Sequence, residues 1–83
     1  MNKNIQIGKV IHYFGNIFVA VIRLNDALKV GDSIKIEGAT TDIDQTVESI
    51  QVNKVELREA KSGDEVGIKV IDKVRAGDRV YRL

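Results

Sequence analysis

The sequence of 83 residues contains no cysteine. Disulfide bonds, thiolate nucleophiles and cysteine metal sites are therefore all excluded. A chain of this length lies near the size at which such staples become useful, so we expect side-chain packing alone to stabilise the fold. The sequence also lacks an apolar run approaching ~20 residues, and no apolar segment follows the N-terminus. The sequence therefore predicts no membrane span and no signal peptide. It predicts a cytoplasmic location.

Basic and acidic residues are nearly equal in number. The chain has 13 basic and 12 acidic residues, which gives a formal net charge of +1. Such a charge creates no whole-molecule field that would draw the protein to nucleic acid or to a membrane. Any binding to an anionic partner must therefore come from a local patch.

Groups able to support catalysis are scarce. His12 is the only histidine, whereas a catalytic triad or a histidine metal cage needs several partners. Asp42 and Asp44 could share one face of a strand near Glu48, but the stretch lacks the glycine and distal glutamate of a calcium loop. We interpret it as a solvated acidic segment. No phosphate loop for a nucleotide is present. The sequence predicts a protein that is not an enzyme and holds no cofactor or metal.

The apolar residues recur with a period of two, which is typical of half-buried β-strands. The pattern predicts strands over residues 5–12, 17–24, 33–38, 45–54, 64–71 and 79–83, with a turn at 13–16. Residues 55–60 are interpreted as a loop or a single turn, with an extended segment as the alternative. Residues 17–22 are apolar at every position, which indicates a strand covered on both faces or one whose outer face meets a partner. Phe18 is expected in the core.

Six short strands with short links are typical of a barrel or a sandwich. Closure is attractive at this length because it removes exposed sheet edges. We therefore predict an all-β fold, a small closed six-stranded antiparallel barrel. It forms a single domain over residues 1–83, with residues 1–4 frayed.

One phrase occurs three times, and in each copy a basic residue precedes a Gly-Asp pair by two positions. Glycine offers positive φ without steric cost, and aspartate can bond nearby backbone N–H groups. Each phrase is thus predicted to turn the chain and start a strand. An anion or metal site at these turns is the alternative. The pairs are Gly31 and Asp32, Gly63 and Asp64, and Gly77 and Asp78.

Residues 29–38, which read KVGDSIKIEG, resemble the second domain of the translation GTPases, such as elongation factor Tu and initiation factor two. Residues 60–68 and 74–78 continue the resemblance in the same order. The chain is also similar to the small barrel at the C-terminus of U32 peptidase-like proteins. The resemblance implies a barrel of the translation-protein type, and tRNA, rRNA or the ribosome as partners.

Basic, aromatic and small polar residues alternate between residues 9 and 16. Aromatic faces can stack bases with about 1–3 kcal/mol each, while a cation follows the phosphate backbone. Other cations could extend this patch if the fold brings them alongside. The alternative is that Tyr13 and Phe14 only cover one end of the core. The candidate RNA-binding residues are Lys9, His12, Tyr13, Phe14, Arg23, Lys54 and Arg58.

Two functional hypotheses follow from these patterns. The first is a non-catalytic module that binds structured RNA weakly and in a salt-sensitive way, because few phosphates can be neutralised at once. The second is a protein–protein adaptor, a detached accessory domain of a larger enzyme or translation factor. The apolar segment 17–22 motivates the second hypothesis, since its outer face could be a docking surface.

Overall fold

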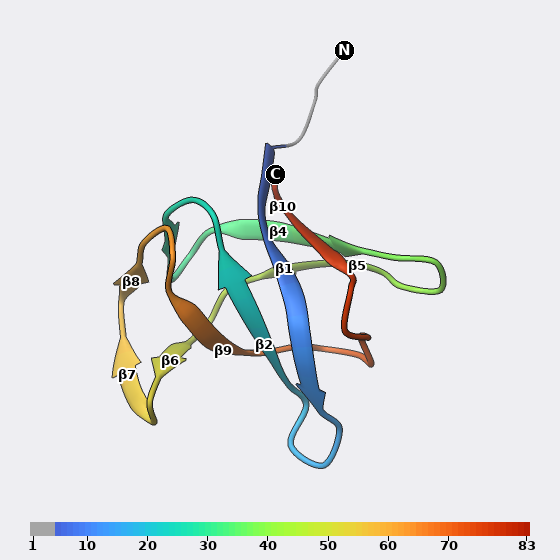
Figure 1. Ribbon diagram of the computed structural model, residues 1–83, viewed down its shortest axis with the longest axis horizontal. Helices are drawn as coiled ribbons and strands as arrows, with labels where there is room; N and C mark the ends of the chain where they lie inside the picture. Colours follow the sequence, from blue (N-terminus) through green and yellow to red (C-terminus); the bar gives the residue numbers. More distant parts are fainter. Residues whose placement is uncertain (1–4) are drawn as a thin grey trace.

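The computed structural model describes residues 5–83, all of them in strands and connecting turns (Figure 1). The expectation that residues 1–4 fray lies outside the described residues. No helix within residues 5–83 has the length and apolar character required to span a membrane. The strands are β1 (Ile5–Phe14), β2 (Val19–Leu24), β3 (Leu28–Lys29), β4 (Ser33–Glu37), β5 (Asp42–Thr46), β6 (Ile50–Val52), β7 (Val55–Leu57), β8 (Glu59–Ala60), β9 (Glu65–Lys69) and β10 (Arg79–Arg82).

Eight strands form one antiparallel sheet in the order β5-β4-β10-β1-β2-β9-β6-β7, and β3 pairs with β8 in a second, two-stranded sheet. The long strand β1 runs through the middle of the molecule, between β10 and β2 (Figure 1). Its register shifts between Gln6 and Gly8 and again between Val10 and His12. Such bulges bend a strand and increase its twist, which lets one sheet curve around one core.

The prediction of a closed six-stranded barrel is wrong, because the large sheet ends at two separate edges, β5 and β7. The chain leaves β5 at Val47, whose backbone bonds to Gly31 and Asp32 rather than to another strand of the sheet. Between β5 and the end of β9 there is no ladder of backbone hydrogen bonds, and the Gln45 side chain bridges the two segments instead. The Gln45 amide donates to the Lys69 carbonyl at 2.9 Å and accepts from the Ile71 N–H at 3.0 Å.

Replacing Gln45 with leucine is expected to destabilise the protein by about 1–2 kcal/mol, because two backbone groups lose their partner. Urea unfolding measures the loss, and hydrogen exchange should show faster exchange at the Ile71 amide. Gln45→Glu keeps the acceptor for the Ile71 N–H but replaces the donor to Lys69 with a carboxylate oxygen, which repels the Lys69 carbonyl at neutral pH. Its loss should therefore shrink at low pH, where the protonated carboxyl can donate to that carbonyl again. Equal stability of all three proteins would show that the bridge contributes nothing.

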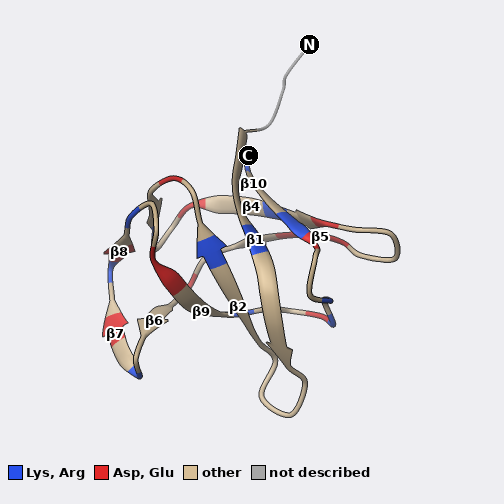
Figure 2. Cartoon of the chain, in the orientation of Figure 1, with Lys and Arg blue, Asp and Glu red and all other residues tan. Residues whose placement is uncertain are grey.

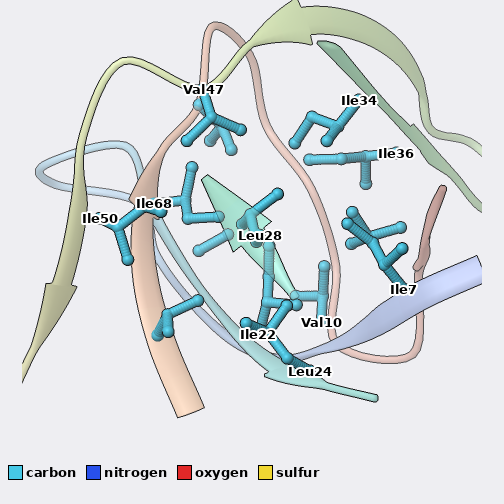
Figure 3. Packing of buried hydrophobic residues seen from close by; sticks show 14 of the residues in the cluster. Ile7, Val10, Ile22, Leu24, Leu28, Ile34, Ile36, Val47, Ile50 and Ile68 are labelled. Carbon is cyan, nitrogen blue, oxygen red and sulfur yellow. The ribbon is translucent and has the colours of Figure 1, made fainter. Parts of the chain in front are cut away.

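The core is aliphatic, and it is filled by the inward residues of the alternating strands (Figure 3). Ala20, Ile22 and Leu24 of β2 are buried, whereas Val19 and Val21 on its other face are half-buried, so the apolar segment predicted as a strand is covered mainly on one face. Leu28 of the small sheet points into the same cluster, so β3 and β8 help to fill the interior. The remaining buried apolar residues are Ile7, Val10, Ile34, Ile36, Ile43, Val47, Ile50, Ala60, Val66, Ile68, Val70, Val74 and Val80.

Each of the three Gly-Asp phrases forms the same turn. In the first, the Asp32 N–H donates to the Lys29 carbonyl at 3.1 Å, and Gly31 at the third position has φ 100°. These are the features of a type II turn, which favours glycine at that position. The Asp32 carboxylate in addition accepts from the Lys29 N–H at 2.9 Å. The pairs at Gly63 and Asp64 and at Gly77 and Asp78 repeat this geometry.

The predicted strand limits differ most from the structure in two regions, and the small sheet of β3 and β8 was not predicted. Strand β1 continues to Phe14, where a turn was expected, and β2 begins only at Val19. Phe18 therefore lies in the β1–β2 turn, 45% exposed and with φ 55°, and not in the core. The predicted strand 45–54 is divided into the end of β5, a connection and β6. Residues 53–54 form a hairpin turn with both φ positive, and residues 55–57 form the edge strand β7.

Candidate functional site

Three cations stand in one row across the middle of the sheet. Lys9 on β1 is opposite Arg23 on β2, and it is also opposite Arg79 on β10. Directly opposite residues point to the same side of a sheet, and here all three are exposed on the face away from the core. Figure 2 shows the corresponding blue segments side by side on β2, β1 and β10. Lys9 and Arg23 were candidates from the sequence, whereas Arg79 was not.

Acidic residues flank this basic row at both ends. Arg23 is opposite Glu65, and its guanidinium lies 2.7 Å from the Glu65 carboxylate. Arg79 is opposite Glu37 on β4. Among the described residues, no carboxylate lies within the 4.0 Å of an ion pair from Lys9 or Arg79. Within residues 5–83, Lys9 therefore has a cation opposite it on both neighbouring strands and no counter-ion.

Two aromatic rings continue along the same face of β1. His12 is opposite Val21 and Phe14 is opposite Val19, and both of these valines are half-buried on the outer face. The rings of His12 and Phe14 meet edge to face, with centroids 4.3 Å apart and planes at 70°. The outer face thus combines a basic row with an adjoining aromatic and aliphatic strip.

The other sequence candidates lie elsewhere. Tyr13 is opposite the buried Ala20 and packs against the core, with its ring edge to face against Phe18 at 6.5 Å. Lys54 is at the tip of the β6–β7 hairpin, and Arg58 follows β7 beside the small sheet. The structure therefore does not unite the seven candidate residues into one surface.

The two acidic residues on β5 share one lysine as their counter-ion. The Lys35 ammonium lies 2.8 Å from Asp42 and 3.3 Å from Asp44. The hydrogen bond from Lys35 to Asp42, and to a smaller extent the one to Asp44, raises the pKa of Lys35 above its ordinary value. This pair is thus part of an exposed ion-pair cluster with one cation. Among residues 5–83 there is no group of three or more histidine, cysteine or acidic side chains placed to hold a metal ion.

Exposed apolar side chains gather at the β1–β2 turn, which carries no charged residue (Figure 2). Phe14, Ile17 and Phe18 are 47%, 58% and 45% exposed. Ile71 is 69% exposed and lies close by, because the Val70 N–H donates to the Phe18 carbonyl at 2.8 Å. We call these four residues, Phe14, Ile17, Phe18 and Ile71, the apolar tip.

Two crystal structures of the C-terminal domain of a U32 peptidase-like protein from Geobacillus thermoleovorans superpose on this fold. Their TM-scores are 0.87 and 0.88, with 20% and 18% sequence identity. The superpositions cover 92% and 100% of this chain, and 96% and 98% of the other. The chain shares the fold of this U32 C-terminal domain. Of the two resemblances drawn from the sequence, the comparisons support the one to U32 proteins and do not show the one to translation factors.

Two curated proteins are similar to this chain in sequence. The chain is 43% identical over 82 residues to an uncharacterized protease of Methanocaldococcus jannaschii, and 38% identical over 83 residues to a collagenase of Porphyromonas gingivalis. It spans about a fifth of the length of these relatives, although 98% of the chain is aligned in each. No protein-family model matches it. The names protease and collagenase therefore belong to longer proteins, and this chain matches only a small part of each.

Proposed function

We propose that this chain is a non-catalytic accessory domain that contacts a larger protein body of the U32 peptidase type. One observation carries the proposal: 98% of the chain aligns with the M. jannaschii protease and yet the chain accounts for only 20% of that protein. The larger body would hold the catalytic groups. This function corresponds to the adaptor hypothesis from the sequence.

The apolar tip supports the proposal as the contact surface. Burying a phenylalanine or isoleucine side chain contributes about 1.5–3 kcal/mol, so four half-exposed apolar residues offer enough energy for a specific contact. Phe18 adds a second argument, because a bulky residue with positive φ is a genuine outlier. A strained backbone that presents an exposed ring favours a role in binding over one in packing.

The test measures binding between this chain and the M. jannaschii protease from which the matching fifth has been removed, after circular dichroism has shown that this body is folded. Calorimetry is expected to detect a 1:1 complex. The double variant Ile17→Ser/Phe18→Asn should weaken it about tenfold, equivalent to about 1.4 kcal/mol. Asparagine tolerates the left-handed conformation at position 18, so the fold should be retained.

Val55→Ser is the matched control, because Val55 is 58% exposed at the distant β6–β7 hairpin. Its affinity should equal that of the unmodified chain. A folded body that does not bind the chain, or that binds the tip variant equally well, would contradict the proposal.

A further inference from the structure

The basic row has an electrostatic cost that the fold does not require. Like charges directly opposite each other on neighbouring strands destabilise a sheet. Lys9 has two such neighbours, Arg23 and Arg79. Of the three cations in the row, only Arg23 has an ion-pair partner among residues 5–83, the Glu65 carboxylate. Any polar residue at position 9 would satisfy an exposed strand position, so the charge of Lys9 needs another explanation.

We propose that the outer face over β10, β1 and β2 binds an acidic polypeptide segment. Carboxylates of the segment would pair with Lys9 and Arg79, whose positive charges have no ion-pair partner within the described part of the chain. This surface borders the apolar tip at Phe14, but the cations that carry the inference lie outside the tip, and the inference does not depend on the proposed function.

The surroundings of the row favour a polypeptide over a nucleic acid. Glu65 lies at one end of the row and Glu37 at the other, so a polyanion that crosses the sheet along the row meets acidic groups on both sides. A partner that runs along β1 instead meets Ile11, His12 and Val21 beyond the row. These are mainly aliphatic neighbours, and they suit apolar side chains placed beside the carboxylates.

The net charge of +1 agrees with this choice. Affinity for nucleic acid comes mainly from phosphates neutralised by cations and falls steeply with salt. Three cations flanked by carboxylates neutralise few phosphates. A short segment with two or three carboxylates instead matches the number of cations in the row.

The probe is a synthetic peptide of sequence Leu-Glu-Leu-Asp-Leu-Glu-Val with both ends blocked, with the same peptide carrying glutamine and asparagine as control. Titration of the ¹⁵N-labelled protein is expected to shift the amide signals of Lys9, Arg23 and Arg79. Raising salt from 50 to 300 mM should weaken binding several-fold, because exposed ion pairs are screened. The neutral peptide should cause no shift.

Lys9→Glu separates folding from binding. It places an acidic group between two arginines, so it should raise Tm by about 2–4 °C. The same change should weaken peptide binding at least tenfold. Lys73→Glu is the charge-matched control outside the row, and it should leave peptide binding within twofold of the unmodified protein.

The outcomes divide cleanly. A peptide that causes no shifts at low salt, or one that binds Lys9→Glu as tightly, overturns the proposal. It is also overturned if a seven-nucleotide single-stranded RNA shifts the same signals at lower concentration than the peptide. Loss of binding on Lys9→Glu together with an unchanged or raised Tm supports it, since unfolding cannot explain that combination.

Discussion

Replacing Gly8 with alanine is expected to lower the free energy of unfolding by about 3 kcal/mol. A Cβ atom at Gly8 would lie 2.7 Å from Cγ2 of Ile22 and 2.8 Å from the Arg23 carbonyl oxygen. Ile22 is fully buried, and the carbonyl belongs to the strand paired with β1. Neither atom can withdraw without moving β2, so the substitution strains the centre of the sheet.

Thermal unfolding measures this effect, and a fall in Tm of about 15 °C is expected for a domain of this size. Gly15→Ala is the matched control, because a Cβ there would meet only the Tyr13 ring at an ordinary 3.5 Å. It should change stability by less than about 0.5 kcal/mol. Equal stability of the two variants would mean that the β1–β2 spacing adjusts freely.

The second large effect is expected at Gly38, which packs against the carboxylate of Asp78. A Cβ at Gly38 would lie 2.6 Å from Cγ of Asp78 and still closer to Oδ1. Asp78 is 5% exposed, and its carboxylate accepts from the Arg75 N–H at 2.9 Å. Gly38→Ala must displace this carboxylate, so a loss of about 2 kcal/mol is expected.

A double-mutant cycle tests that cause. Asp78→Ala should itself cost about 2 kcal/mol, because it leaves the Arg75 N–H without its partner. Once the carboxylate is absent, adding Gly38→Ala should cost less than about 0.5 kcal/mol. Urea unfolding of the four proteins gives the coupling. Additive losses would show that Gly38→Ala acts through something other than Asp78.

Asp64 provides a comparison for the buried turn. It accepts from the Lys61 N–H at 3.1 Å in the same type of turn, but at an exposed position. Water can replace that hydrogen bond, which is why Asp64→Ala should cost less than Asp78→Ala.

Much of the fold could be predicted from local pattern. Period-two alternation gives the buried residues of β4 and β9, whereas the uniformly apolar segment 17–22 does not distinguish the buried face of β2. Closure of the sheet could not be predicted, because it depends on whether a backbone ladder or the Gln45 side chain spans the gap next to β5. The β6–β7 hairpin was also missed. Its two positive-φ residues are Asn53 and Lys54, and lysine at the second position gives no glycine signal.

The candidate site depended on register more than on pattern. The sequence offers Lys9 as a cation within the aromatic stretch 9–16 and Arg23 as a cation beyond it. Lys9 is seen to lie between Arg23 and Arg79 only once β1 is aligned with both β2 and β10. Arg79 follows the third Gly-Asp pair directly, where the other two phrases have Ser33 and Glu65. That difference between the phrases is the one sequence signal that could have pointed to it.

The pairing of the first strand with the last has a consequence during protein synthesis. Ile5 is opposite Arg82, so β1 cannot gain its second neighbour until the C-terminal residues have left the ribosome. Until then the nascent chain holds a long apolar strand with one bare edge, a condition that invites mispairing. Folding of this domain should therefore await the emergence of residues 79–82 and be slow, on the millisecond-to-second scale typical of β proteins with distant pairings.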